Sequence, residues 1–173
     1  MTPDSVGPLS RPLPLHRITP AGVDVTVTAD ESERAALAAD LDLPAIHRLE
    51  GRFRVTGQTD RVRVVGTVDA SVDQTCVVTL DVFTSDVMED VEVEFAQGGG
   101  VRAAAVDLDL ETDPPDELRG DHIDLGAIAA EFLALGLDPY PKKPGATFEG
   151  GADEIAGGPF DKLAALRPRG GDG

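Results

Sequence analysis

Alternation of apolar and polar residues between His47 and Phe95 constrains the fold of this chain more than any other feature of its sequence. Because successive side chains of a strand point to opposite faces, a period of two predicts half-buried antiparallel strands with one solvated face. The apolar positions of three successive runs are Leu49, Phe53 and Val55; Val62, Val64, Val68, Ala70 and Val72; and Val87, Val91, Val93 and Phe95. The sequence therefore predicts an antiparallel β-meander.

Two helices are predicted on either side of this meander. Asp30 is a suitable N-cap residue, and Glu33 three positions later completes a capping-box pattern before the Ala-rich run 35–41. Asp124 is a suitable N-cap for a second helix, and Gly136 is expected as the C′ residue that follows it. Its predicted apolar stripe consists of Leu125, Ile128, Phe132 and Leu135. We expect an α+β fold in which a curved, partly barrel-like antiparallel sheet is packed by two helices.

The length of 173 residues indicates one domain with tails. Residues 1–10 are Pro-rich and are predicted to form a flexible tail, and residues 11–148 form the domain. Residues 149–173 are predicted to be an acidic, Gly-rich tail with a short apolar patch at 160–166. Alternation at 106–110 predicts a short edge strand.

The charge is strongly one-sided, with 32 Asp and Glu against 15 Lys and Arg, a formal net charge of -17. Because neutralisation of phosphates supplies most non-specific affinity for nucleic acid, a generic RNA-coating or DNA-coating role is disfavoured. The sequence has no apolar run long enough for a membrane helix and no signal-peptide pattern near Met1, so a cytoplasmic protein without membrane contact is expected.

One hairpin concentrates basic residues. If Gly57 to Asp60 forms its turn, the outer face carries Arg52, Arg54, Arg61 and Arg63. With a two-residue loop, Arg54 is expected opposite Arg63, and facing like charges are destabilising unless they are neutralised. One interpretation is a patch that binds anions or an RNA backbone. The favoured interpretation is that a neighbouring strand supplies Asp90, Glu92 and Glu94 as ion-pair partners.

The sequence offers little that indicates catalysis or metal binding. Cys76 is the single cysteine, so it cannot form an internal disulfide, and it is expected to be buried in an apolar alternation with Val78, Leu80 and Val82. The stretch 107–113 resembles the start of a calcium loop but lacks the required Gly and Glu at its later positions. No HExxH, GxSxG or phosphate-loop pattern occurs. We therefore expect no enzymatic activity, no cofactor, no metal and no small-molecule substrate.

The segment from Asp138 to Gly145 contains three prolines and the only tyrosine. Such a segment favours polyproline II, which costs little entropy to order on a partner. It is equally compatible with a rigid strap packed over the core. Both interpretations stay open at the level of sequence.

Four short motifs occur in an order and spacing that resemble the YceD-like large ribosomal RNA subunit accumulation family in its alphaproteobacterial form. The residues that carry the resemblance are Gln74, Cys76 and Thr79; Asp124, Leu125, Gly126 and Glu131; Pro139, Tyr140 and Pro141; and Pro144 and Gly145. The resemblance extends over nearly the whole chain after the first ten residues. Many members carry a CxxC pair where this chain has Cys76 and Thr79, so a thiolate metal clip does not transfer here.

The resemblance implies a bacterial, non-enzymatic ribosome-biogenesis role in the synthesis, processing or stability of large-subunit (23S) ribosomal RNA. It does not supply a molecular mechanism. Either the Arg hairpin contacts an rRNA precursor directly, or the acidic surface receives a basic ribosomal protein, which the net charge favours. An acidic adaptor or regulatory scaffold outside ribosome assembly is the alternative.

Overall fold

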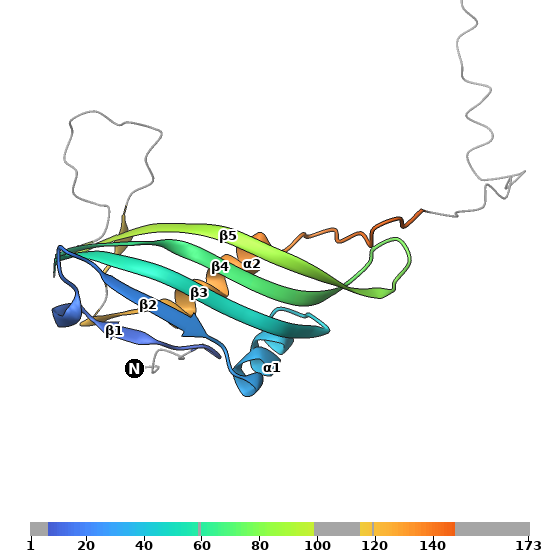
Figure 1. Cartoon of the computed structure of the whole chain (residues 1–173), viewed down its shortest axis with the longest axis horizontal. Helices are drawn as coiled ribbons and strands as arrows, with labels where there is room; N and C mark the ends of the chain where they lie inside the picture. The colour runs from blue at the N-terminus through green and yellow to red at the C-terminus, as the bar shows by residue number, and fades with distance from the viewer. Residues whose placement is uncertain (1–6, 59, 99–114, 119, 148–173) are drawn as a thin grey trace, which may run out of the picture.

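A long, twisted five-stranded sheet in the order β2-β3-β4-β5-β6 dominates the computed structural model, which describes residues 7–58, 60–98, 115–118 and 120–147 (Figure 1). A separate two-stranded sheet joins β1 to β7. In chain order the elements are β1 (Pro12–Pro14), the 3₁₀ helix η1 (Leu15–Arg17), β2 (Val23–Thr28), α1 (Glu31–Asp40), β3 (Ala45–Gln58), β4 (Arg61–Thr75), β5 (Val82–Ala96), β6 (Asp116–Glu117), β7 (His122–Asp124) and α2 (Leu125–Gly136).

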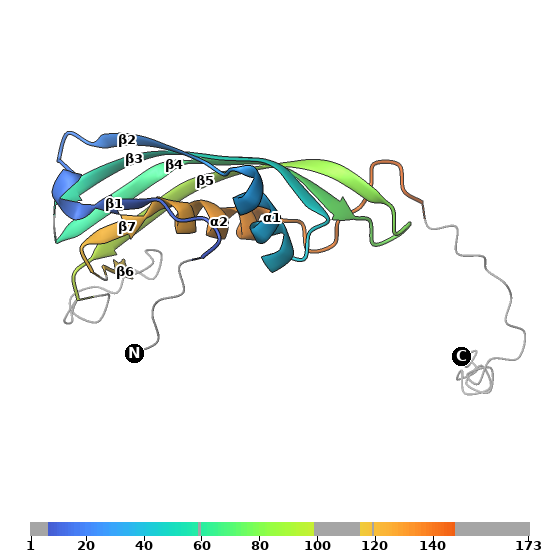
Figure 2. The ribbon, with the colours of Figure 1, turned by 90° about the horizontal axis from the view of Figure 1, so that it is seen from below.

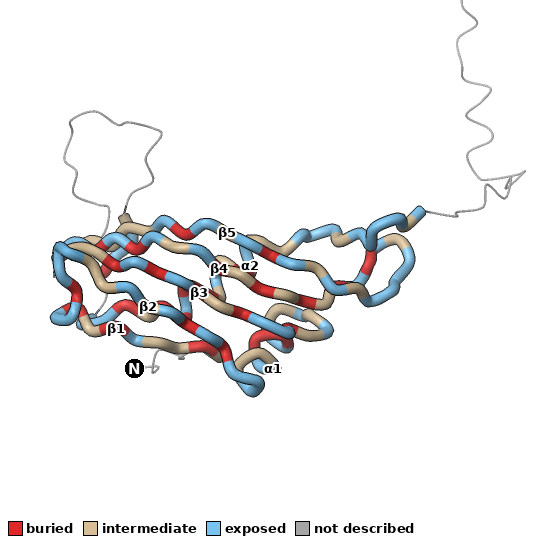
Figure 3. The backbone as a smooth tube through the Cα atoms, viewed as in Figure 1, coloured by how far each residue is buried: buried red, intermediate tan, exposed pale blue. Residues whose placement is uncertain are grey.

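The predicted antiparallel meander is confirmed by β2, β3, β4 and β5, which pair in sequence order. Burial alternates along β3, β4 and β5, as the banding of the tube in Figure 3 shows. The apolar residues Phe53, Val55, Val62 and Val64 face the core and are fully buried. The period of two thus places one face of the sheet against the core and leaves the other in solvent.

The register of the β3–β4 hairpin differs from the expected one. Gln58 pairs with Arg61, so Arg54 lies opposite Val65 and Arg63 lies opposite Thr56. The predicted pairing of Arg54 with Arg63 is therefore wrong. Gly57 is still within β3, with a φ of 138°, and a Cβ there would lie 2.2 Å from the carbonyl oxygen of Arg61. This close approach requires glycine in the strand and places the reversal one residue later in the chain.

The sheet is open, so the predicted partly barrel-like closure is not seen. Its only parallel pairing in the described part of the chain joins β6 to Phe95 and Ala96 at the end of β5. The predicted edge strand at 106–110 and the acidic stretch 107–113 lie outside the described residues. So does the whole of the predicted C-terminal tail at 149–173.

Both predicted helices are present with the predicted N-caps. Asp30 Oδ1 accepts the backbone N–H of Glu33 at 2.9 Å, and Glu33 Oε2 accepts that of Asp30 at 2.9 Å. This reciprocal pair is the predicted capping box of α1. Asp124 Oδ1 caps α2 by accepting the N–H groups of Gly126 and Ala127 at 2.9 and 3.2 Å.

Helix α2 lies along the inner face of the sheet, beside β1 and β7 (Figure 2). Its buried residues are Leu125, Gly126, Ile128, Ala129 and Leu133. The predicted stripe is therefore rotated: Phe132 is only half-buried and Leu135 is 69% exposed. The helix packs across β2, β3, β4 and β5, and Phe132 is packed against the core while Leu135 remains accessible.

Gly136 is not the predicted C′ residue, because α2 includes it and the cap residue is Leu137. A Cβ at position 136 would lie 2.5 Å from the Glu89 side chain and 2.6 Å from that of Val87. Glycine is required here because the end of α2 lies close against β5.

The N-terminal segment reaches the core earlier than expected. Leu9, placed by the sequence in the flexible tail, is 1% exposed and belongs to the hydrophobic core. Residues 1–6 lie outside the described part of the chain. Within the described residues, no helix is long and apolar enough to cross a membrane.

Candidate functional site

The four arginines of the hairpin lie on the outer face of the sheet, and each is exposed and ion-paired. Arg61 meets Glu94 at 2.7 Å, and Arg63 meets Glu92. Two of the three acidic partners expected from β5 are thus present. Asp90 lies opposite Thr67 and bonds none of these arginines.

The remaining two arginines use acidic partners that the sequence did not indicate. Arg54 bonds Asp24 of β2 at 3.0 Å, and Arg52 bonds Glu50 of its own strand at 2.6 Å. Asp24 is found only once β2 is known to lie opposite this part of β3. Exposed ion pairs of this kind contribute about 0–1 kcal/mol each to stability. Their main effect is therefore to neutralise the charge of this row of four arginines.

Two of the short motifs, far apart in sequence, meet at the end of the sheet where β4 turns into β5. The side-chain amide of buried Gln74 donates to the carbonyl oxygen of Asp138 at 3.2 Å, and its oxygen accepts from Ser85 at 3.0 Å. The backbone N–H of Val77 donates to the carbonyl of Pro141 at 2.9 Å. The segment after α2 therefore lies against the β4–β5 turn as a strap.

Cys76 is buried in this turn, but the predicted apolar alternation around it is wrong. Residues 76–81 form a tight reversal in which Leu80 has a φ of 61°, and the backbone N–H of Leu80 donates to the carbonyl of Cys76 at 2.9 Å. The Thr79 side chain, followed by the backbone N–H of Lys143 at 3.3 Å, lowers the pKa of Cys76 to about 7. Thr79 thus makes the largest contribution to the lowered pKa of the Cys76 thiol.

The strap leaves part of its surface free. Tyr140 is 72% exposed, although its backbone N–H is held by Asp138 Oδ1 at 2.8 Å. Gly145 adopts a φ of 80°, and a turn closes there through the bond from Ala146 N–H to Lys143 O at 2.9 Å. Pro141 and Lys143 hold the segment to the turn, but none of residues 138–147 is buried, so the predicted packing of a strap over the core is wrong. Recognition of a partner through Tyr140 stays a prediction.

The motif around Asp124 holds the N-terminal segment against α2. The Asp124 carboxylate accepts from the Ser10 hydroxyl at 2.5 Å and from the Arg11 N–H at 2.7 Å. Burial acts to raise the pKa of Asp124, but these hydrogen bonds and those from the α2 N-terminus lower it. A Cβ on Gly126 would lie 2.8 Å from backbone atoms of residues 9–11, and Leu125 is fully buried. The occurrence of Asp124, Leu125 and Gly126 in the motif is therefore explained by their roles in the fold.

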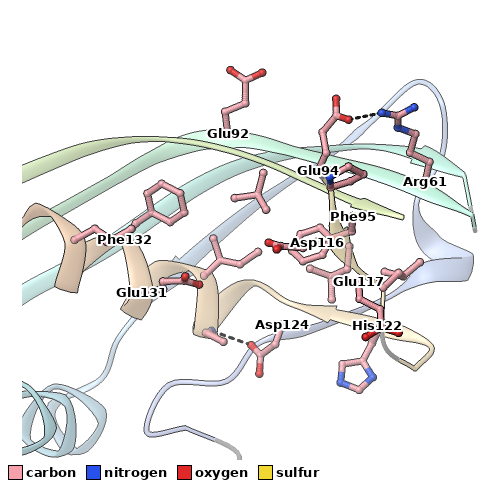
Figure 4. Close-up of a pocket in the computed structure, with 17 residues that line it drawn as sticks. Arg61, Glu92, Glu94, Phe95, Asp116, Glu117, His122, Asp124, Glu131 and Phe132 are labelled. Carbon is pink, nitrogen blue, oxygen red and sulfur yellow. Dashed lines mark hydrogen bonds and ion pairs between the residues drawn. The ribbon is translucent and has the colours of Figure 1, made fainter. Parts of the chain in front are cut away.

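An open groove of about 880 Å³ lies between the end of β5, α2 and the β6–β7 region (Figure 4). Glu131, one of the residues that carry the family resemblance, lines this groove together with Phe132 and Leu135. Val93 and Phe95 line it from β5, and Asp116 from β6. The groove combines an apolar wall with carboxylates.

No local sequence pattern indicates this groove, because its walls come from β5, α2 and the β6–β7 region, which are apart in the chain. Among the described residues, no three His, Cys, Asp or Glu side chains gather closely enough to hold a metal ion.

These features define an α+β domain with an open, mostly antiparallel sheet, a packed helix and a segment after α2 that is tied to the β4–β5 turn. The family model described as "Large ribosomal RNA subunit accumulation protein YceD" matches residues 64–166. The chain belongs to this YceD family, as the resemblance predicted. The family description links it to the accumulation of large-subunit ribosomal RNA. Comparisons with curated proteins and with solved structures each gave no significant match.

The matched span covers the groove more fully than it covers the arginine hairpin. It includes the motif residues from Gln74 to Gly145 and most of the residues that line the groove. It begins at Val64, after all four hairpin arginines. The match is also shorter than the resemblance, which extends from residue 11 onward.

Proposed function

We propose that the protein supports the accumulation of large-subunit (23S) ribosomal RNA in bacteria as a non-enzymatic assembly factor that binds a basic ribosomal protein. The family description supports the link to ribosomal RNA. The net charge of -17 supports a basic partner, because such a surface attracts cations and repels an RNA backbone at long range.

The single observation that carries the choice of partner is the pairing of the hairpin arginines. Each of Arg52, Arg54, Arg61 and Arg63 already contacts a carboxylate. An RNA phosphate would have to displace these carboxylates, which would then lie beside it as like charges. The row is therefore poorly suited to a phosphate backbone.

The ribosome profile of a strain depleted of this protein tests the role in large-subunit assembly. We expect fewer free large subunits and less mature large-subunit RNA, with both restored by the wild-type chain. A profile with normal large-subunit levels would contradict the proposal and favour an adaptor outside ribosome assembly.

Direct contact between the hairpin and RNA is tested separately by charge reversal. Changing Arg52, Arg54, Arg61 and Arg63 to Glu removes every basic side chain of the row. We expect this variant to restore the ribosome profile as the wild type does. A loss of rRNA affinity together with a loss of rescue would favour the direct RNA mechanism instead.

A further inference from the structure

We propose that the free edge of β5, together with the groove beside it, binds an extended basic segment of a protein partner, which adds to the sheet as a further strand. The site itself is inferred from the geometry. Its assignment to a basic ribosomal protein rests on the function proposed above.

The first observation is that one side of β5 is open over most of its length. All of Val82–Ala96 pairs with β4 on one side, but on the other side only Phe95 and Ala96 pair, with β6. From Val82 to Glu94 the outer edge has no partner strand in the part of the chain that the structure describes. An unpaired edge is a template to which an extended peptide can add through backbone hydrogen bonds.

The second observation is that the groove opens onto this edge. Four consecutive residues, Glu92 to Phe95, line it, although successive side chains of a strand point to opposite faces. In Figure 4, Glu92 projects away from the helix, whereas Phe95 and Phe132 lie between the sheet and α2. A strand added beside β5 would therefore turn every second side chain toward Phe132 and the exposed Leu135.

The third observation is the charge of the edge and the groove. Four carboxylates here make no hydrogen bond or ion pair within the described residues: Glu89, Asp90, Asp116 and Glu131. Asp86 on the same strand interacts electrostatically with Arg48. Glu92 and Glu94 are two further carboxylates, and each forms an ion pair with an arginine of the hairpin. A segment that alternates Lys or Arg with apolar residues matches both the acidic rim and the apolar wall.

Charge also argues against two other occupants. A second copy of β5 would bring the same carboxylates against themselves, and facing like charges destabilise a strand pair. The chain's own segment 106–111 alternates apolar residues with Asp107, Asp109 and Glu111, so it carries the same sign as the edge. Neither of these two acidic occupants is attracted by the negative potential of the β5 edge, whereas a basic strand is.

The probe is a short fluorescent peptide of alternating Lys and Val, titrated with the full chain while its fluorescence anisotropy is measured. We expect saturable binding that is lost when Glu replaces Lys in the peptide. The double variant Asp90→Lys with Glu131→Lys should weaken binding by about tenfold or more. The matched control is Glu31→Lys with Asp40→Lys on α1, which changes the net charge equally and should bind nearly as the wild type does.

Backbone methylation of the peptide tests whether it binds as a strand. Two peptides are compared, one N-methylated at its Lys residues and the other at its Val residues. Only alternate N–H groups of an added strand point toward β5, so one methylated peptide should lose binding and the other should keep it. Equal binding by both methylated peptides would contradict strand addition. Equal weakening by the two double variants would show non-specific charge attraction and would also overturn the proposal.

One further variant tests occupation by the chain itself. If the peptide binds only after residues 99–113 are replaced by a Gly-Ser linker, the edge belongs to that segment and the proposal is wrong. Sedimentation shows whether copies associate through the edge: a dimer that the Asp90→Lys, Glu131→Lys variant alters would also contradict it.

The site and the proposed function can fail independently. If depletion leaves large-subunit levels normal while the peptide still binds at the β5 edge, the function is wrong and the site stands. If depletion lowers large-subunit levels but the Asp90→Lys, Glu131→Lys variant restores them fully, the function stands and the assigned role of the site is overturned.

Discussion

The backbone N–H of Lys143 donates to the sulfur of Cys76 at 3.3 Å, although the two residues are 67 positions apart in the chain. This bond links the strap after α2 to the turn between β4 and β5. With the Thr79 side chain, it gives the sulfur hydrogen-bond donors of the kind that stabilise a thiolate.

The first prediction concerns the titration of Cys76. The ultraviolet absorbance of its thiolate should titrate with a midpoint of about 7 in the folded protein and nearer the ordinary thiol value after denaturation. Thr79→Val should raise the folded midpoint, because it removes the largest stabilising contact. The Cys76→Ser variant is the control and should show no such titration. An unshifted midpoint in the wild type would contradict the hydrogen-bonded arrangement.

The same shift predicts how stability depends on pH. Because folding lowers the pKa of Cys76, its contribution is full above the pKa of the unfolded thiol and is lost as pH falls through about 7. Urea unfolding of wild type and Cys76→Ser should therefore differ more at mildly alkaline pH than at mildly acidic pH. A constant difference across this range would argue against the linkage.

Gly126 should tolerate no side chain. An added Cβ would lie 2.8 Å from the backbone of residues 9–11, so Gly126→Ala should lower the free energy of unfolding by about 1–3 kcal/mol. A Cβ added at Gly7 would meet nothing within 4 Å, so Gly7→Ala is the matched control and should change little. Urea denaturation of the two variants gives the comparison.

Asp124 should matter both as a cap and as the anchor of the N-terminal segment. Asp124→Ala removes acceptors for Ser10, Arg11 and the first N–H groups of α2, and should cost about 2 kcal/mol or more of unfolding free energy. Asp124→Asn retains a good N-cap side chain and should cost less. Equal losses in the two variants would point to the charge alone.

Leu133 and Leu135 should behave oppositely although both are on α2. Leu133 is fully buried, so Leu133→Ala should cost about 2–5 kcal/mol of stability. Leu135 is mostly exposed, so Leu135→Ser should change stability by only about 0.5 kcal/mol. The second variant should instead weaken peptide binding at the β5 edge. Thermal unfolding together with anisotropy separates the two effects.

The sequence predicted the meander and both N-caps because these depend on local periodicity and on contacts between near neighbours. Asp30 and Glu33 are three residues apart, so their capping box is readable from the sequence. The register around Gly57 was missed because it depends on how closely Arg61 approaches the glycine. Gly136 was misassigned for a similar reason, since its role depends on contact with β5.

The surfaces were harder to predict than the fold. Asp24 became a partner of Arg54 only through the placement of β2 beside β3. The groove forms where α2 leaves the edge of β5 uncovered, and no local pattern specifies that offset. Alternation alone also placed Cys76 in a strand, whereas hydrogen bonds within 76–81 and to the strap hold it in a turn.

Affinity capture of the tagged chain from cells, with and without RNase, tests the central claim most directly. We expect a basic large-subunit ribosomal protein to be recovered after RNase treatment and to be lost with the Asp90→Lys, Glu131→Lys variant. Recovery of large-subunit RNA alone, abolished by RNase and unaffected by that variant, would contradict it.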